Sequence, residues 1–534
     1  MRSPAQTSTS STLRPCLIAC AHGFWLAALA CAGRPGRLNP ILSDGTHYTA
    51  DPAPIVVGDT LYVLSGRDMA SVDQNDFVMP EWQMLSVAGE PTRTPWTHRP
   101  HFLQPEQVFR WAAPNRAYAA QMVRGVDGRF YLYAPVVQAR TNDRDKFAIG
   151  VAVAPTPIGP WTDAHPSGPV VSQSYPVVNT IQNIDPTVLV DDDQRVFMYW
   201  GTFGKMKAVE LERDMITFKG APTDVTGATG FFEAPWLFKR RGTYYLAYAA
   251  NTVGPSTECT EAVYYACLAY ATAHTPLGPW SYRGVFLDPV SSTTSHPGIV
   301  EYRGAWYLAY HTADAVGGGH FRRSVAIDRL EWDDTATPAR IRKVVPTGGP
   351  PRDLAPTTNV ASHARITSSN APVPVQYWLR ALNDGKVRPA PLPPDMWASW
   401  TRDNPSQVWV LYQWDEPVTI DASSLWFWGD HAAGAGEGVA PPRAWRLEFW
   451  AGTAWQPVRA TVPYPTGLHA RSHVAFEPVT TRCLRAVFEA STDGRSYAAV
   501  AAQEWEVFAV DRRAPRRPSI VGAASPECAA RLSP

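Results

Sequence analysis

Three acidic residues stand in front of short apolar segments that resemble one another. Asp51 and Asp185 each precede a proline, and Glu233 is followed by Ala234 and Pro235. After each acid the chain runs through an apolar stretch, a turn rich in Gly or Asp, and a β-branched or aromatic stretch, which is the pattern of two paired strands. A repeated unit can carry its first residue to the same place in every copy. We therefore expect the three carboxylates to converge at one pole of the fold.

Converging carboxylates can cleave a glycosidic bond by acid–base catalysis. In an inverting glycosidase one carboxylate deprotonates water while a carboxylic acid protonates the leaving oxygen, and the two lie roughly 6.5–9.5 Å apart. The acid must stay protonated near neutral pH, and a third carboxylate nearby raises its pKa by repulsion between like charges. An Asp-Pro pair at the start of a strand is also ordinary turn chemistry. Three acids in matching repeat phase favour the catalytic interpretation.

The repeat that contains the acids has two further copies. Residues 121–133 form a fourth copy, and residues 296–310 form a fifth, in which His296 stands where an acid would be. The copies recur at intervals of roughly 50–70 residues, about the length of a four-stranded propeller blade with its loops. No amphipathic helical stretch is long enough to indicate an α/β fold. We predict an all-β chain that begins with a five-bladed β-propeller, the catalytic domain, over residues 39–347.

Composition and charge narrow the classes of partner. The 48 Lys and Arg residues equal the 48 Asp and Glu residues, so no bulk charge points to nucleic acid or to an acidic membrane surface. The 21 Trp and 21 Tyr suit β structure and stacking on sugars, although most of these rings are expected in the core. No segment after the N-terminus is apolar enough to span a bilayer. We expect a monomer whose partner is carbohydrate, with no nucleic acid and no membrane.

The N-terminus has the features of an export signal. Arg14 precedes a mostly apolar run over residues 16–30, which ends in an Ala-x-Ala cleavage pattern. We predict a signal peptide over residues 1–30 and a secreted or periplasmic protein. In that compartment Cys259 and Cys267 are close enough in sequence to pair, which the sequence leaves open. Cys483 and Cys528 are expected to be free.

A change of pattern near residues 346–356 marks a domain boundary. Gly and Pro interrupt the strands there, and short alternating strands at regular spacing then indicate a β-sandwich over residues 357–510. Residues 511–534, rich in Arg and Pro, are predicted to be a disordered tail. The order of the Asn-x-Ala, Ala-x-x-Asp-Gly, Trp-x-Ser-Trp and Pro-Val-Thr-Ile motifs resembles the discoidin (factor 5/8 type C) modules. Such modules bind glycans or only pack against a partner, and both alternatives stay open.

The N-terminal domain resembles glycoside hydrolase family 43, and within it the secreted arabinoxylan α-L-arabinofuranosidase and β-xylosidase group. The resemblance implies a five-bladed propeller and inverting hydrolysis without a required cofactor. It assigns Asp51 as general base, Glu233 as general acid, and Asp185 as the carboxylate that orients the acid and tunes its pKa. The segments that carry the resemblance, in order, are residues 39–42, 48–52, 78–82, 185–186, 199–201, 233–236, 295–301 and 323–328.

The same resemblance implies further site residues. It places His296 near the propeller axis, beside a possible structural calcium reached through water, and Arg323 on the pocket floor. A buried core histidine and a simple salt bridge are the alternatives for these two. Tyr118 stands where relatives commonly have Trp, so it keeps a stacking face but reduces it and adds a hydroxyl. We also assign Trp236 to substrate binding.

Two classes of function follow from these residues. The favoured one is an exo-acting glycosidase that releases arabinofuranose or xylose from plant-type polysaccharides or oligosaccharides. The alternatives are a catalytically silent, lectin-like glycan-binding protein and an endo-acting arabinanase. The presence of all three acids argues against the silent protein. The sequence does not distinguish arabinofuranoside from xyloside or exo from endo action.

Overall fold

The computed structural model describes residues 39–251, 259, 265–347, 358–370, 373–374 and 376–510. The predicted signal peptide, at residues 1–30, and the predicted tail, at residues 511–534, lie outside the described residues. Most of the predicted boundary between the domains also lies outside them.

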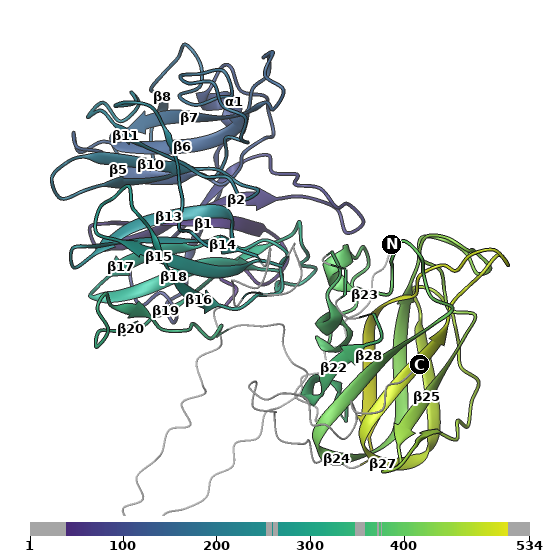
Figure 1. Cartoon of the computed structure of the whole chain (residues 1–534). Coiled ribbons are helices and arrows are strands. Elements are labelled where there is room, and N and C mark those ends of the chain that lie inside the picture. The colour runs from purple at the N-terminus through teal and green to yellow at the C-terminus, as the bar shows by residue number, and fades with distance from the viewer. Residues whose placement is uncertain are drawn as a thin grey trace, which may run out of the picture. The chain divides into compact units, whose positions relative to one another are not determined.

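The first domain consists of five antiparallel sheets whose strands follow one another in chain order. Each innermost strand contacts the innermost strand of the next sheet, and the last contacts the first, so the sheets close into a ring. The predicted five-bladed β-propeller is thus confirmed, and it is drawn from purple to teal in Figure 1. The innermost strands are β1 Tyr48–Val57, β5 Gln121–Arg124, β9 Thr187–Val190, β13 Phe231–Arg240 and β17 Gly298–Tyr302.

Each blade grows outward from its innermost strand by antiparallel pairing. The first four blades have four strands, and the fifth has three described strands of its own. A separate pair, β20 Trp332–Asp333 and β21 Arg340–Ile341, follows the last blade, and α1 Pro105–Val108 lies between the first two. No helix in the described ranges is long and apolar enough to cross a membrane. The outer strands are β2 Thr60–Asp68, β3 Trp82–Val87, β4 Thr97–Leu103, β6 Phe130–Val137, β7 Phe147–Ala154, β8 Thr162–Asp163, β10 Val196–Trp200, β11 Lys207–Leu211, β12 Thr223–Asp224, β14 Thr243–Ala250, β15 Cys267–Ala273, β16 Ser281–Leu287, β18 Ala305–Thr312 and β19 Ser324–Leu330.

The first described residues complete the fifth blade. The backbone N–H of Ile41 donates to the carbonyl of Val325 in β19 at 2.8 Å. The side-chain amide of Asn39 acts like a peptide group, because it donates to the carbonyl of Ile327 at 2.8 Å and accepts the N–H of Ile327 at 2.9 Å. The start of the chain therefore takes the place of an outer strand in the last blade and closes the ring.

The blades are held together by burial on both faces of their inner strands. In β14, successive side chains point to opposite faces. Tyr245 and Ala247 join one buried cluster, while Leu246 and Tyr248 join another. A strand between two neighbouring blades needs two apolar faces, which explains why these segments are apolar throughout rather than alternating.

The C-terminal domain is built on one hydrogen-bonded set of strands, drawn green to yellow in Figure 1. Its two longest strands, β24 Gln407–Trp428 and β27 Arg471–Glu489, pair with each other, and both halves of each contribute to one buried cluster. Irregular pairing after Gln413 and Ile420 lets these strands bend around that core. The remaining elements are η1 Ala361–His363, β22 Arg365–Ser368, η2 Leu379–Asn383, η3 Pro393–Asp395, β23 Trp397–Ala398, β25 Ala444–Trp450, β26 Trp455–Pro457 and β28 Ala501–Ala509.

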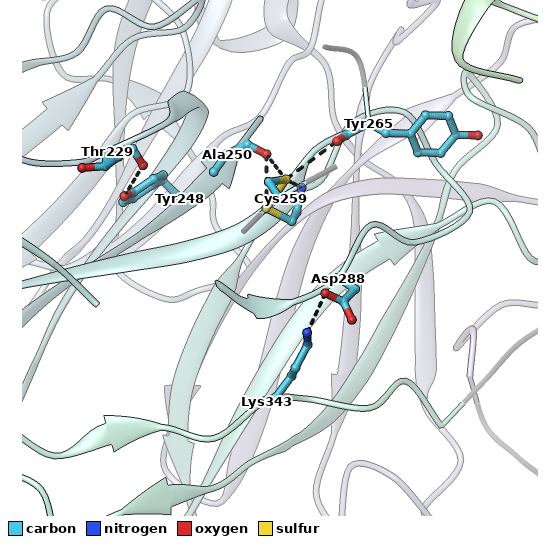
Figure 2. Close-up of a disulfide and its surroundings, with 8 residues drawn as sticks. Thr229, Tyr248, Ala250, Cys259, Tyr265, Asp288 and Lys343 are labelled. Atoms are coloured by element: carbon cyan, nitrogen blue, oxygen red, sulfur yellow. Dashed lines mark hydrogen bonds and ion pairs between the residues drawn. A yellow bond between two sulfur atoms is a disulfide. The ribbon is translucent and has the colours of Figure 1, made fainter. Parts of the chain in front are cut away.

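Cys259 and Cys267 form a disulfide, the pairing that the sequence left open (Figure 2). Their Cα atoms are 5.8 Å apart, and Cys267 is the first residue of β15. Cys259 Sγ lies 3.0 Å from the carbonyl oxygen of Ala250, at the end of β14, so the bridge lies at the end of blade 4 that carries Glu233. Cys483 is also disulfide-bonded, and the expectation that it is free is wrong.

Candidate active site

The predicted acids lie at the same end of three innermost strands. Asp51 and Asp185 have left-handed backbones, each with φ of 54°, and each directly precedes a proline. In blade 4 the equivalent residue is Ala234, with φ of 56°, and Glu233 is one position earlier. The sequence pattern predicted that the three acids occupy the same position in each repeat. In the structure Asp51 and Asp185 do so, but Glu233 is offset by one residue. Strained non-glycine backbones of this kind cost about 1–3 kcal/mol each and occur mainly at functional sites.

Asp51 is a buried carboxylate held by Arg323. The two guanidinium nitrogens donate to the two carboxylate oxygens at 2.8 and 3.3 Å. Nδ1 of His311 accepts the backbone N–H of Asp51 at 3.2 Å, and Nδ1 of His296 lies 3.9 Å from Oδ1. Burial alone would raise the pKa of Asp51, but the Arg323 charge and the neighbouring histidines outweigh it and hold this pKa well below its usual range. Asp51 is thus ionised at any ordinary pH and can accept a proton.

A second carboxylate, Asp68, fixes Arg323 from the other side. Asp68 accepts from Nε of Arg323 at 2.9 Å, from a terminal nitrogen at 3.0 Å, and from its backbone N–H at 2.9 Å. Both side chains are buried, and the ring of Phe77 lies 5.0 Å from the guanidinium carbon. Asp68 and Phe77 were not predicted. A buried acid at the end of β2, directly after Arg67, carries no distinctive sequence signal.

Replacing Asp68 by Asn tests whether this pair positions Arg323. Asp68→Asn keeps the shape but leaves the buried guanidinium with only Asp51 as a charged partner, and losing one side of a buried ion pair is costly. We expect kcat/KM on an aryl glycoside to fall about tenfold or more. Arg323 then interacts with Asp51 alone, which lowers the pKa of Asp51 further and makes it a weaker base. The exposed Asp59→Asn variant is the matched control. A Asp68→Asn rate within twofold of wild type, in a folded protein, would contradict this role.

Glu233 and Asp185 form the second half of the cluster. The hydroxyl of Thr202 donates to Oε2 of Glu233 at 3.2 Å, and Asp185 accepts the backbone N–H of Ala234 at 3.1 Å. Asp185 is therefore bonded to the residue next to Glu233 and orients its backbone. Burial, and then the negative charge of Asp51, raises the pKa of Glu233 to about 7. Burial, followed by the charges of Glu233 and Asp51, raises the pKa of Asp185 well above its usual range.

This raised pKa predicts the basic side of the pH profile. If Glu233 must be protonated, activity on an unactivated glycoside should fall about tenfold per pH unit above a pKa of about 7, since the protonated fraction falls at that rate. The lowered pKa of Asp51 predicts no loss on the acidic side until well below pH 4. A kcat/KM profile on arabinoxylan measures both limbs. A profile that stays flat to pH 9 would remove Glu233 from this role.

Of the other predicted site residues, His296 and Tyr118 lie near Asp51 or its neighbour Ala50. His296 adjoins Asp51, and burial lowers its pKa to about 4, so it is neutral at ordinary pH. The ring of Tyr118 packs in a small buried cluster with Ala50, the residue before Asp51, and its hydroxyl accepts from Arg116 at 3.3 Å. Trp236 lies in the main core instead.

The position of Trp236 gives it a packing role. Its indole is 5% exposed, and its N–H donates to the carbonyl of Ile299 in the neighbouring blade at 2.9 Å. A ring that spans two innermost strands in this way helps to hold β13 against β17. The hydrogen bond of its indole therefore goes to the neighbouring blade, and its assignment to substrate binding stays a prediction.

The donor set around His296 does not fit a directly bound calcium. Calcium takes six to eight oxygen ligands, usually including several carboxylates. The charge of Asp51 is already matched by Arg323, and the described residues contain no group of three or more His, Cys, Asp or Glu able to hold a metal ion. We therefore derive no step through a metal.

Comparison with known proteins shows the family of the N-terminal domain. The sequence profile of the glycosyl hydrolases family 43 matches residues 38–338, which is more than half of the chain and spans the propeller. The chain belongs to glycosyl hydrolases family 43. As a member of that family it is a glycosidase, and hydrolysis in the family generally needs no cofactor.

Several relatives of this family 43 glycosidase have known activities. A xylosidase/arabinosidase of Bacteroides ovatus is 30% identical over 330 residues, covering 54% of this chain and 92% of the relative. An arabinoxylan arabinofuranohydrolase of Bacillus subtilis is 26% identical over 361 residues, covering 59% and 66%. Among solved structures, a family 43 β-xylosidase/α-arabinofuranosidase from a compost metagenome, in complex with xylotriose and free of calcium, is 26% identical, covers 59% of this chain and 99% of its own, and has a TM-score of 0.47.

Proposed function

We propose that this family 43 glycosidase is an inverting, exo-acting enzyme that removes arabinofuranosyl or xylosyl residues from plant-type polysaccharides. The observation that carries the proposal is the opposite protonation of two neighbouring acids. Arg323 keeps Asp51 ionised, whereas burial and the Asp51 charge keep Glu233 protonated up to about pH 7. A fixed base and a fixed acid are the two groups that inverting hydrolysis requires.

In this mechanism each group has one task. Asp51 removes a proton from water as the water attacks the anomeric carbon, and Glu233 gives its proton to the leaving oxygen. Asp185 orients the backbone beside Glu233, and burial together with the negative charge of Asp51 keeps the acid protonated. Arg323 holds Asp51 in place. After product release, one proton passes from Asp51 to Glu233 and restores the starting state.

The choice of pentose rests on the relatives. The family members described above carry the names xylosidase/arabinosidase and arabinoxylan arabinofuranohydrolase. Release assays on an aryl arabinofuranoside, an aryl xyloside, arabinoxylan and linear arabinan test it directly. Release of arabinose or xylose monomers from the aryl glycosides and from arabinoxylan supports the proposal. Shorter oligomers from linear arabinan alone would indicate an endo-acting arabinanase, and no release from any substrate would indicate a silent glycan-binding protein.

We also propose that the enzyme is exported. The Cys259–Cys267 disulfide supports this, since such bonds persist in oxidising compartments, and the sequence of residues 1–30 has the pattern of a signal peptide. N-terminal sequencing of protein recovered from the medium or periplasm tests the proposal. Recovery of the intact chain, beginning at Met1, in the cytoplasm would contradict it.

A further inference from the structure

A second cavity lies at the other end of blades 4 and 5 from the catalytic acids. Glu233 stands near the start of β13, and Arg240 is the last residue of that strand. At about 3.3 Å per residue, the strand separates them by roughly 20 Å. The cavity holds about 780 Å³ and is lined by the turns after β13 and β17 and by residues from β19 to β21. This volume is in the range of ordinary ligand sites.

One wall of the cavity is held rigid by Arg240. Its guanidinium donates to both carboxylate oxygens of Asp334, at 2.6 and 3.1 Å, and lies over the ring of Trp332 at 4.2 Å. The Arg240 side chain is only 8% exposed. Its Nε and the indole N–H of Trp332 are both buried and have no hydrogen-bond partner among the described residues. This wall is therefore preformed and retains donor capacity.

Next to this wall, the cavity lining combines an aromatic ring with two charged side chains that form no ion pair among the described residues. Trp306 is half-buried and meets Trp332 edge to face, with centroids 5.5 Å apart. Arg342 and Glu301 are both exposed, and in the described part of the chain neither forms an ion pair. Nε of Arg342 donates to the carbonyl of Trp332 at 3.1 Å, which fixes the guanidinium at this wall. An indole ring, the terminal N–H groups of Arg342 and the Glu301 carboxylate in one lining suit a ligand with both apolar C–H surface and hydroxyl groups.

The charges that line the cavity balance one another. Lys239 and Arg329 line it too, but they pair with Asp191 and Glu90, which lie outside the lining. When Lys239 and Arg329 are left out because their partners lie elsewhere, the lining has as many guanidinium groups as carboxylates. The three guanidinium groups are those of Arg240, Arg241 and Arg342, and the three carboxylates are those of Glu301, Glu331 and Asp334. A balanced set of donors and acceptors favours a neutral ligand over an anion.

We propose that this cavity is a second, non-catalytic binding site for a neutral polysaccharide chain. The choice of a pentose-based chain rests on the proposed function. Trp306 would stack on a sugar ring, while Arg342 and Glu301 would bond its hydroxyl groups. Because the cavity is roughly 20 Å from the acids, it would hold the enzyme on the polymer without entering the reaction.

Affinity electrophoresis of the full chain tests the site. We start from Asp51→Asn, which stops turnover, and measure retardation in gels that contain soluble arabinoxylan. Adding Arg342→Ala and Glu301→Ala together should weaken the apparent affinity about fivefold, as should Trp306→Ala. The two charged residues are exposed, so their removal is compatible with folding even if Trp306→Ala is not. Arg303→Ala is the matched control, because Arg303 is exposed on the same turn but does not line the cavity.

Four outcomes separate this inference from the proposed function. Weaker retardation, together with an unchanged kcat/KM of the same substitutions on an aryl pentoside in the active protein, supports the site. Retardation equal to that of Arg303→Ala overturns it, even if aryl pentosides are cleaved. If the chain binds polygalacturonate more strongly than arabinoxylan, and Arg342→Ala abolishes that binding, the proposal that the ligand is neutral is overturned. Loss of aryl pentoside cleavage in the wild-type chain would refute the proposed function alone.

Discussion

Glu233→Gln should lower kcat/KM on arabinoxylan about 10²–10⁴-fold while sparing much of the activity on a dinitrophenyl pentoside. A poor leaving group needs a proton from Glu233, whose pKa is about 7, whereas a dinitrophenolate leaves without a proton. Glutamine keeps the size of the side chain and can still accept the hydroxyl proton of Thr202. Initial rates on the two substrates, measured at pH 6, give the result.

The comparison between the two substrates separates acid catalysis from structural damage. The exposed Glu212→Gln is the control, and it should leave both rates unchanged. The basic limb of the pH profile should also disappear in Glu233→Gln, because the group that titrates there has been removed. An equal loss on both substrates would show that Glu233 acts on something other than the leaving group.

Asp51→Asn should abolish cleavage of both substrates, by a similar factor of about 10²–10⁴. The attacking water must lose a proton whatever the leaving group is. A better leaving group therefore does not restore the rate. Asn keeps a hydrogen-bond acceptor for Arg323, which also stays anchored by Asp68. Rates on the dinitrophenyl pentoside, with Asp59→Asn as the control, measure the effect. Retention of the rate on the activated substrate would argue against a base.

The stereochemistry of the wild-type product tests the same assignment independently. A base that activates water yields a sugar of inverted anomeric configuration, whereas a nucleophile yields a retained one through a covalent intermediate. Proton NMR in the first minutes, before mutarotation, distinguishes the two anomers. A retained anomer would make Asp51 a nucleophile and would refute the proposed mechanism.

The sequence identified the acids because their signal is local. Asp51, Asp185 and Glu233 each stand before a short apolar stretch of sequence, and the repetition of that pattern marks a propeller. The one-residue offset of Glu233 was not visible, because it depends on which residue takes the left-handed backbone, and Ala234 does so without any sequence signal.

Residues that act through distant partners were not predictable. Asp68 and Arg323 are 255 positions apart in the sequence, and no pattern around either residue indicates that the other is its partner. Trp236 was assigned to substrate binding from the segment that also contains Glu233, whereas in the structure its side chain belongs to the main buried cluster. In the second domain, β24 continues through Pro417 with irregular pairing.

Closure of the propeller by the first residues sets the order in which the domain can form during synthesis. Asn39 emerges from the ribosome well before its partner Ile327, which is 288 positions later. Blades 1 to 4 can pair internally as they appear, but the ring, and with it the assembly of Asp51 with Arg323, must wait until blade 5 has been made. If the enzyme is exported as we propose, a chain that crosses the membrane while blade 5 is still being made does so before Asp51 can meet Arg323.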